Sequence, residues 1–420
     1  MTTTIPVTSG GSFASAGFRR FFAARTLAES GTEVAAFALP LLAVLVLDAA
    51  PAQVGLLGAL TTAAYLLVGL PAGVWTDRLR RRPVLVAGQL LHGLILLSIP
   101  LAWALDALTL TQLYVCALLG GVASLFARIA QQGLLPAIVG RDRLMAANSA
   151  LGGLSSTALL AGRGAGGHLV QHLGAPLVIL VDGVAQFVSG LLTLTVRVRE
   201  PEPATGERSL RTEVAEGLRH VFGHPLLRSM ALSALLVNLG LGALVLMTPV
   251  LIVTDLGLAE GMVGMFFMVG AAGVLLGSLV AARVEARLGP GRTLLGCALL
   301  AAAGGAAVPF LTAGNFWAVS VVWALSQAGI GAVNVVQLTL RQRWTPDRLL
   351  GRMTATLRFM MTGALTFSGL YAGAVAQVWG VRAALVAGAA ILALGWIPLA
   401  RPARFTVPED ATGPGRTAPR

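Results

Sequence analysis

Twelve apolar segments, each long enough to cross a lipid bilayer as a helix, constrain this chain more than any other feature. A helix needs about 20 mostly apolar residues to span the hydrocarbon core. Of the 420 residues, 56% are hydrophobic and 11% are charged, whereas soluble domains carry about 25% charged residues. An ordinary soluble enzyme is therefore excluded, and we predict an all-α membrane protein. The predicted spans are residues 26–47, 52–74, 83–104, 108–128, 147–170, 176–196, 226–250, 261–282, 293–312, 317–339, 353–376 and 383–400.

The basic residues indicate which way the spans face. The formal net charge is +12, and all 30 basic residues are arginines. By our count, 27 of them lie in the terminal segments, in alternate loops or at the span ends that border these loops, whereas the opposite loops hold Arg382 and four acids. Arginine-rich loops remain in the cytoplasm, so we expect both termini and the central loop there. Because the arginines are divided among loops, they do not indicate nucleic-acid binding. The composition, rich in Ala and Gly and free of lysine, points to a GC-rich bacterial genome and hence to the bacterial cytoplasmic membrane.

The chain also contains an internal repeat. RDRLMAANSAL (141–151) aligns with PDRLLGRMTAT (346–356), and LGAPL (173–177) aligns with WGVRA (379–383). Two similar six-helix bundles in the same orientation would leave a cavity between them. The predicted parts are a cytoplasmic N-terminal segment (1–25), an N-terminal bundle (26–196), a cytoplasmic linker (197–225) with a possible surface helix near 207–222, a C-terminal bundle (226–400) and a disordered cytoplasmic tail (401–420).

One loop and three further segments carry a resemblance to a known family. GVWTDRLRRR (73–82) resembles the Gly-x-x-x-Asp-Arg-x-Gly-Arg-Arg loop of the major facilitator superfamily. RLMAAN, LVDGVAQFVSGLL and RQRWTPDRLLGR resemble its twelve-span bacterial drug and secondary-metabolite exporters. The resemblance covers most of the chain. It implies the major facilitator fold, with twelve helices in two pseudo-symmetric halves, and it implies export.

The resemblance also implies a cytoplasmic gating motif, made of Gly73, Asp77, Arg78, Arg81 and Arg82. In the resembling transporters this loop makes charge-assisted contacts between the halves, and such contacts are strong when partly desolvated. The alternative is that the arginines only set the topology. The loop departs from the family pattern because arginine stands where a glycine is usual. The matching loop of the second half, RVEARLGPGR, has no aspartate at the corresponding position, so we expect asymmetric gating contacts.

Two carboxylates lie one helical turn apart in the first predicted span. If the span enters the membrane near residue 26, a rise of about 1.5 Å per residue places Glu29 about 5 Å deep and Glu33 about 10 Å deep. A carboxylate held in a low-dielectric cavity can bind and release a proton near neutral pH. We therefore expect Glu33 to carry the coupling proton or to attract cationic substrates, with Glu29 assisting. The alternative is a structural ion pair between Glu33 and an arginine near the cytoplasmic surface.

Arg163 and Asp182 lie at similar depths in the fifth and sixth predicted spans. Either charge alone would be costly within the membrane, so we predict that they form an ion pair. Such a pair could be purely structural, or it could recognise an anionic substrate or take part in coupling. Arg163 also occupies the place of a proline that related exporters often carry. The glycines around it in AGRGAGGHL are expected to allow close helix packing.

The remaining polar residues of the spans are weaker candidates. His92 could shuttle protons or simply pack, and Arg358 is expected to extend to the cytoplasmic surface. Asn238, Asn334 and Gln337 could line a substrate cavity or form hydrogen bonds between helices. Packing is the expected role of both cysteines. For the cluster in the eighth span we expect packing or lipid contact rather than an adaptable binding surface; it comprises Met262, Met265, Met268, Phe266 and Phe267.

The sequence therefore favours a secondary transporter that works by alternating access. No phosphate-binding loop and no catalytic or metal-ligand constellation is visible, so we expect no enzyme, no cofactor and no metal, with a proton gradient as the energy source. The expected function is proton-coupled efflux of small amphipathic compounds, such as drugs or antibiotics, by a monomer. Two alternatives stay open: uptake or exchange of a hydrophilic metabolite, and a non-transporting membrane receptor or scaffold.

Overall fold

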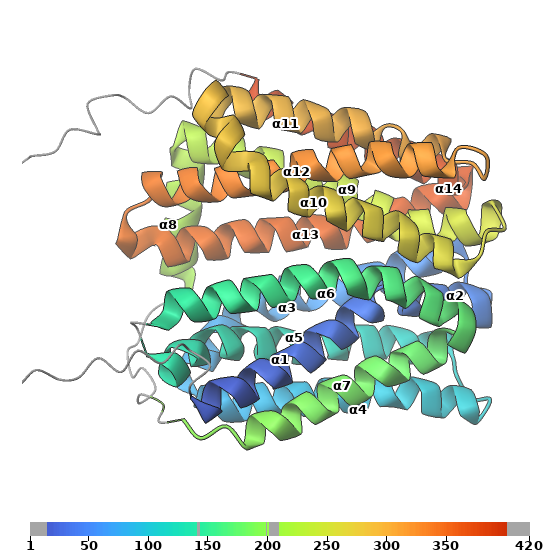
Figure 1. Ribbon diagram of the computed structural model, residues 1–420, viewed down its shortest axis with the longest axis horizontal. Coiled ribbons are helices and arrows are strands. Elements are labelled where there is room, and N and C mark those ends of the chain that lie inside the picture. The colour runs from blue at the N-terminus through green and yellow to red at the C-terminus, as the bar shows by residue number, and fades with distance from the viewer. Residues whose placement is uncertain (1–14, 141–142, 199, 201–209, 401–420) are drawn as a thin grey trace, which may run out of the picture.

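The computed structural model describes residues 15–140, 143–198, 200 and 210–400, and the regular elements in these ranges are all helical (Figure 1). In the N-terminal half they are α1 (Ala16–Val34), α2 (Ala38–Leu47), α3 (Pro51–Arg78), α4 (Arg81–Ala104), α5 (Leu110–Val139), α6 (Leu144–Leu173) and α7 (Ala175–Leu194). After the linker helix α8 (Leu210–Gly223), the C-terminal half contains α9 (Pro225–Val250), η3 (Leu251–Asp255), α10 (Glu260–Leu288), α11 (Pro290–Gly305), η4 (Val308–Phe310), α12 (Phe316–Trp344), α13 (Asp347–Trp379), α14 (Val381–Leu394) and η5 (Ile397–Leu399).

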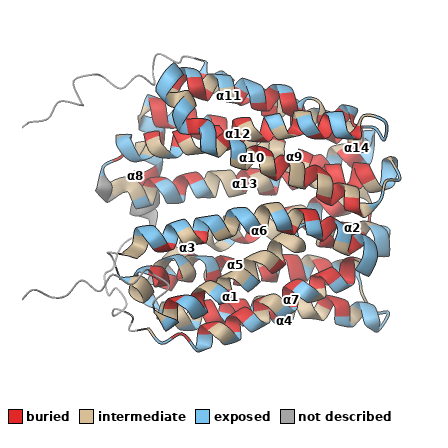
Figure 2. Ribbon diagram, viewed as in Figure 1, coloured by how far each residue is buried: buried red, intermediate tan, exposed pale blue. Residues whose placement is uncertain are grey.

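The number of spans agrees with the sequence. Within the described ranges, eleven helices are long and apolar enough to cross a membrane, or twelve if the bent pair α1 and α2 is one span. Buried residues face the spaces between helices, whereas the outer faces are exposed (Figure 2). Large apolar side chains such as Leu101 and Leu279 are both 62% exposed there, as expected for helices in contact with lipid. The prediction of a twelve-span, all-α fold is confirmed.

The first span differs from its prediction in two ways. It begins at Ala16 rather than near residue 26, because the Ser15 hydroxyl accepts a hydrogen bond from the backbone N–H of Phe18 at 3.0 Å. Such N-caps stabilise helix starts, and the buried Phe18 and Phe21 hold this extra length against the bundle. The span also breaks between α1 and α2, which are bent by 41°, with Phe37 at the break.

The predicted repeat is visible in matching turns of the two halves. Gly174 separates α6 from α7 with φ = 82°, and Gly380 separates α13 from α14 with φ = 88°. Glycine adopts this part of backbone space without steric cost. Both glycines come from the aligned segments LGAPL and WGVRA, so the same turn closes the same helix pair in each half.

Each half contacts the other along two helix pairs, α3 with α13 and α6 with α10. Glycines bring these backbones close together: a Cβ on Gly55 would lie 2.5 Å from the Cα of Gly373, and one on Gly167 would lie 2.6 Å from the Cα of Gly264. Small residues allow such close approach between helices in membranes. A larger side chain at these contacts would force the two halves apart.

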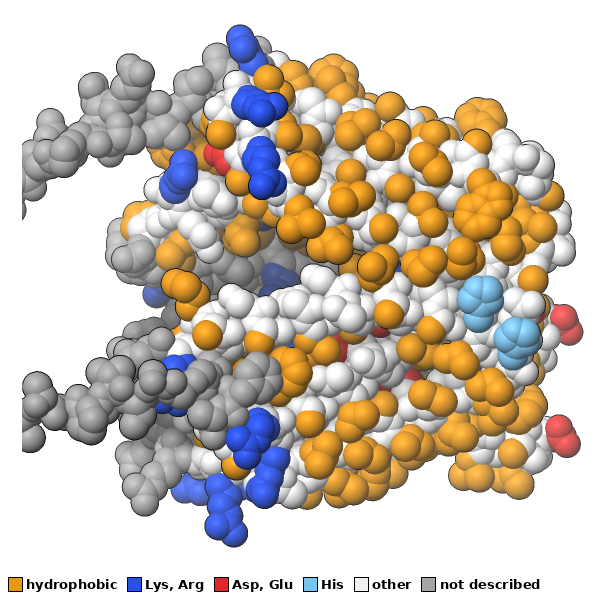
Figure 3. Space-filling view, viewed as in Figure 1, with side chains coloured by type: hydrophobic (Ala, Val, Ile, Leu, Met, Phe, Trp, Pro, Cys, Tyr) orange, Lys and Arg blue, Asp and Glu red, His pale blue; other side chains and the backbone are white. Residues whose placement is uncertain are grey.

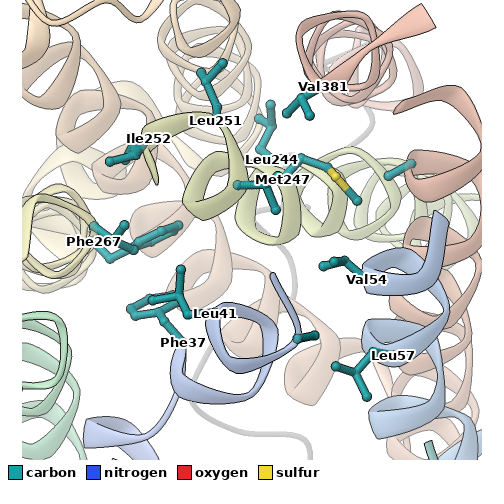
Figure 4. Close-up of a cluster of buried hydrophobic side chains, with 14 of the residues drawn as sticks. Phe37, Leu41, Val54, Leu57, Leu244, Met247, Leu251, Ile252, Phe267 and Val381 are labelled. Atoms are coloured by element: carbon teal, nitrogen blue, oxygen red, sulfur yellow. The ribbon is translucent and has the colours of Figure 1, made fainter. Parts of the chain in front are cut away.

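An apolar cluster from both halves fills the space between them at one end of the molecule, which we call the closed end (Figure 4). Phe37, at the break before α2, stacks on Phe267 of α10 with ring centroids 4.4 Å apart. Leu41 of α2 and Met247 of α9 are at most 1% exposed in the same cluster. Water is therefore excluded from the centre of this end.

The opposite end carries most of the arginines, and we call it the arginine-rich end. Figure 3 shows arginine side chains gathered there in both halves, with acidic side chains at the closed end. The linker helix α8 packs at the arginine-rich end on α13, where Val221 is buried against Met353 and Leu357. An ion pair between Glu216 and Arg352 adds to this contact. α8 thus lies where the sequence placed a surface helix, although residues 201–209 are outside the described ranges.

Candidate functional site

A central cavity of about 1030 Å³ lies between the two halves. Its walls come from α3 and α5 on one side and from α9, α12 and α13 on the other. It reaches the arginine-rich end, because Gly73, Gln342 and Gly351 line it and lie within the last two or first two turns of their helices there. Figure 3 shows the surface hollowed between the halves at this end. The cavity is at the upper end of the volumes typical of small-molecule sites.

The two walls of the central cavity differ in chemistry. The N-terminal wall is mostly apolar or small, with Leu125 and Ile129 of α5 beside glycines of α3. On the C-terminal wall lie two arginines, Arg341 and Arg358, together with Asn238. No Asp or Glu occurs among the described residues that line this cavity. The charge of the cavity is therefore positive and comes from one half.

A smaller and more polar space, which we call the N-half pocket, lies inside the N-terminal half. It has a volume of about 110 Å³ and is lined by Glu29, Glu33 and His92 together with Arg128. Gln89, also in its lining, donates a hydrogen bond of 2.8 Å to Ser189 of α7. The sequence grouped Glu29 and Glu33 with Asn238 in one cavity. The structure instead separates them, because the carboxylates line the N-half pocket and Asn238 lines the central cavity.

Glu33 forms an ion pair with Arg163. The Nε atom of Arg163 lies 3.1 Å from Oε2 of Glu33, and the two side chains are 26% and 23% exposed. The guanidinium carbon of Arg163 also lies 5.9 Å from the ring centroid of Phe37, within range of a cation–π contact. Since Phe37 stacks on Phe267, a continuous series of contacts joins Glu33 to the apolar cluster of the closed end.

The predicted ion pair between Arg163 and Asp182 is wrong. Helix α1 packs between α6 and α7 and separates the two side chains. A Cβ on Gly162 of α6 would lie 2.7 Å from the Cβ of Glu33, whereas a Cβ on Gly31 would lie 2.8 Å from Oδ1 of Asp182. Glu33 of α1 is therefore the partner of Arg163, which the sequence had paired with Asp182 of α7.

Asp182 is held by neutral groups instead. It is 6% exposed, and its Oδ1 accepts a hydrogen bond of 3.2 Å from Nε2 of Gln186. The same amide donates to the Thr32 hydroxyl at 2.9 Å. No ion pair of Asp182 is found among the described residues. Glu29, in contrast, pairs with Arg25 one turn earlier in α1, at 3.0 Å.

The gating motif makes contacts mainly within the N-terminal half. Arg81 donates a hydrogen bond of 2.7 Å to the carbonyl of Gly133 in α5, and the backbone N–H of Arg82 donates to the Glu200 carboxylate at 3.0 Å. Arg78 is exposed, and Gly73 lines the central cavity. The side chain of Asp77 is outside the described part of the structure. The role of the motif in gating stays a prediction.

The other candidates are scattered. The side-chain nitrogen of Asn238 donates a hydrogen bond of 2.8 Å to the carbonyl of Ala234. Asn334 is exposed but is not among the residues that line the central cavity. Gln337 is 3% exposed and accepts a hydrogen bond from Arg341.

His92 lies between the N-half pocket and a neighbouring space of about 150 Å³. Phe266 and Phe267 pack with Trp323 in the closed-end cluster, as expected of packing residues.

Sequence reasoning missed the importance of Arg341 and the position of Arg358 on the cavity wall. The apolar run that defined the tenth span ends at residue 339, so Arg341 counted as a loop residue, yet α12 continues to Trp344. Arg358 was expected to extend to the cytoplasmic surface; in the structure it is exposed to the central cavity, which opens at the arginine-rich end. The spacing of Arg341 from Gln337, one helical turn, was the signal that could have placed Arg341 on the inner face of the helix.

Two six-helix halves around a cavity that is open at one end and closed at the other define a membrane transporter. The sequence profile of the Major Facilitator Superfamily matches residues 21–311 and, in an overlapping second match, residues 230–419. The chain belongs to this superfamily, and the expected family is confirmed.

Curated relatives and solved structures agree with this assignment. The chain is 25% identical over 391 residues to the enterobactin exporter EntS of Escherichia coli O127:H6, with 90% of each chain covered. Among solved structures, a mutant of the nucleoside transporter NupG gives a TM-score of 0.76 at 10% identity, with 92% of this chain and 99% of the other covered. A bacterial homologue of the iron transporter ferroportin in its inward-facing state gives 0.72 at 19% identity, with 92% and 98% covered. These structures show that the fold is shared.

Proposed function

We propose that this transporter exports small amphipathic compounds, including drugs or antibiotics, from the bacterial cytoplasm in exchange for protons. The observation that carries this proposal is the central cavity, which is mostly apolar, large enough for a drug-sized compound and open at one end only. The arginine content of that end supports its placement in the cytoplasm, with both chain termini. Similarity to the enterobactin exporter EntS supports the direction of transport.

Proton coupling is assigned to the contacts of Glu33. In this conformation Glu33 is paired with Arg163, and Arg163 rests on Phe37 at the closed end. Protonation of Glu33 removes its charge and hence weakens the ion pair. Arg163 can then leave the Phe37 ring, which loosens the stack of Phe37 on Phe267 and favours opening of the closed end. Glu29 assists by keeping Arg25 away from Glu33.

The loop from Gly73 to Arg82 is assigned the complementary role at the other end. The cavity is open there, and the loop contacts the carbonyl of Gly133 in α5 through the Arg81 side chain and Glu200 of the linker through the backbone of Arg82. When the cavity closes at this end, α12 and α13 approach the loop, and its arginines become available for contacts between the halves. This assignment rests on the resemblance of the loop and on its position beside the cavity.

The test is accumulation of a panel of fluorescent compounds, antibiotics and enterobactin in bacterial cells that lack their major exporters. Cells that express the chain should accumulate less of its substrates, and both a protonophore and the substitution Glu33→Gln should abolish the difference. Asp106→Asn, in the exposed turn between α4 and α5 and away from both cavities, is the matched control and should export as the wild type does. Export that persists in Glu33→Gln cells with unchanged pH dependence contradicts the role of Glu33. Increased accumulation would support uptake instead.

A further inference from the structure

The two arginines of the central cavity have no acidic partner. Arg341 of α12 and Arg358 of α13 both line the cavity, and no ion pair of either is found among the described residues. Unpaired charges within a membrane protein are costly unless they face water or a ligand. Since the cavity keeps both arginines without a neutralising carboxylate, it is suited to a ligand that brings the negative charge.

Arg341 is the better defined of the two. Its guanidinium donates to the side-chain oxygen of Gln337, which fixes its position on the wall of α12. The Nε of Arg341 and the Nε2 of Gln337 are both buried, and neither has a hydrogen-bond partner in the described part of the chain. These two atoms are donors. Buried polar atoms are normally hydrogen-bonded, so two adjacent unsatisfied donors indicate a missing acceptor.

Arg358 faces the cavity from α13 with hydroxyl groups on either side. Thr354 and Thr362 lie one turn before and one turn after it, and all three line the cavity. Guanidinium and hydroxyl groups together form charge-assisted hydrogen bonds to carboxylate, sulfonate or phenolate oxygens. This face of α13 therefore offers donors along about two helical turns.

The opposite wall offers no charge to a ligand. Gly73 of α3 lines it, and a Cβ there would meet no atom within 4 Å. Leu125 and Ile129 make the adjacent surface apolar. The carboxylates Glu29 and Glu33 are not part of this wall, because they line the N-half pocket and are already paired with Arg25 and Arg163. They are therefore poorly placed to attract a cationic substrate.

We propose that the central cavity binds an amphipathic anion, with its acidic group at Arg341 and Arg358 and its apolar part against α3 and α5. This inference names the substrate class of the proposed exporter and rests on that function for its biological meaning. The site itself can be tested without transport, because binding to the cavity is measured directly.

The test compares two dyes that share a xanthene ring system: fluorescein, an anion at neutral pH, and tetramethylrhodamine methyl ester, a cation. The full chain is placed in phosphatidylcholine nanodiscs, and binding is followed by fluorescence polarisation, with empty nanodiscs to subtract dye in the lipid. Fluorescein should bind at least about tenfold more tightly than the cation, the scale of one hydrogen bond to a charged group. Arg341→Gln and Arg358→Gln should each lower fluorescein affinity about tenfold. Arg358→Lys keeps the positive charge and should retain most of the affinity for fluorescein.

Arg343→Gln is the matched control, because Arg343 lies two residues from Arg341 on α12 but does not line the cavity. It should leave both affinities unchanged. Arg358→Glu should reverse the preference toward the cationic dye. Equal affinity for the two dyes, preference for the cation, absence of fluorescein binding, or folded glutamine variants with unchanged affinity would each overturn the proposal.

The proposed function has separate readouts. Charge-selective binding without any proton-driven flux in proteoliposomes would support the proposed anion site and contradict the proposed export function. Proton-driven export of both dyes at equal rates would keep the exporter and contradict the anion site.

Discussion

The two halves of this transporter place their charges differently. In the N-terminal half, Glu29 and Glu33 are paired with arginines and face a small pocket. In the C-terminal half, Arg341 and Arg358 face the large central cavity without acidic partners in the described structure. Each carboxylate of the first half already has a cationic partner, whereas an arginine without an acidic partner is available to an anionic ligand. The proposed function and the proposed anion site therefore assign energy coupling to one half and substrate recognition to the other.

The largest expected effect is at the contact between the halves, where a single larger side chain should stop them from moving against each other. Gly167→Val on α6 would place a side chain against the backbone of Gly264 on α10, where even a Cβ would be 2.6 Å from a Cα. The closed end should then fail to close, and we expect transport to be abolished, as measured by flux in proteoliposomes. Gly153→Val is the control on the same helix, because a Cβ there meets no atom within 4 Å. Normal flux in the Gly167 variant would contradict the close packing.

The second prediction concerns the ion pair. Arg163→Ala leaves Glu33 without its partner in a partly buried position. Removal of one member of a fully buried pair costs about 3–5 kcal/mol, and the exposure of about a quarter of each side chain reduces the expected loss to about 1–2 kcal/mol. Thermal unfolding in detergent should show this loss, and transport should fall strongly.

Two double variants sharpen this second prediction. Glu33→Arg with Arg163→Glu keeps both charges at the observed contact and should recover stability without recovering proton coupling. Arg163→Asp with Asp182→Arg should recover neither, because α1 separates these two positions. If the exchange of Arg163 and Asp182 restored stability, the observed pairing would be contradicted.

A third prediction tests the apolar wall of the central cavity. Gly73→Leu adds a side chain where the structure has open space, so the fold should tolerate it. We expect the variant to weaken binding of bulky substrates up to about tenfold through lost volume, with little effect on small ones. Binding of a graded series of anionic dyes to purified protein measures this effect. An equal loss for small and large dyes would indicate a gating defect instead.

The smallest expected effect is at the linker helix. Glu216→Gln removes the ion pair with Arg352, which links α8 to α13 at a partly exposed position. Exposed ion pairs contribute about 0.2–1 kcal/mol, so stability should fall by no more than this, and the dye preference should not change. A changed preference would show that α8 influences the cavity.

The sequence predicted the fold well because each span is read from its own composition. The apolar runs, the arginine distribution and the repeat with Gly174 and Gly380 are local signals, and the structure contains the corresponding helices and turns. The break between α1 and α2 was missed although Pro40 is its local signal, since a proline ring clashes with the carbonyl four residues earlier, here that of residue 36. Prolines also lie inside α3, α4 and α5, so a proline in an apolar run does not by itself mark a break.

The candidate site was predicted less well because it depends on which helices touch. Glu33 and Arg163 were both singled out, yet their pairing required knowledge that α1 lies between α6 and α7. Arg341 was taken for a loop residue because an apolar run ends before the helix does. Long-range packing and helix ends are therefore the two pieces of information that the sequence lacked.

The central claim is that recognition and coupling are separate, and it is tested most directly by one experiment on two variants. Fluorescein binding and pH-gradient-driven fluorescein export are measured on the same reconstituted protein for wild type, Glu33→Gln and Arg358→Gln. We predict that Glu33→Gln keeps wild-type affinity but loses the dependence of export on the gradient. Arg358→Gln should lose affinity, while its residual export still follows the gradient. If Glu33→Gln lost affinity to the same extent, or Arg358→Gln lost gradient dependence, the separation would be contradicted.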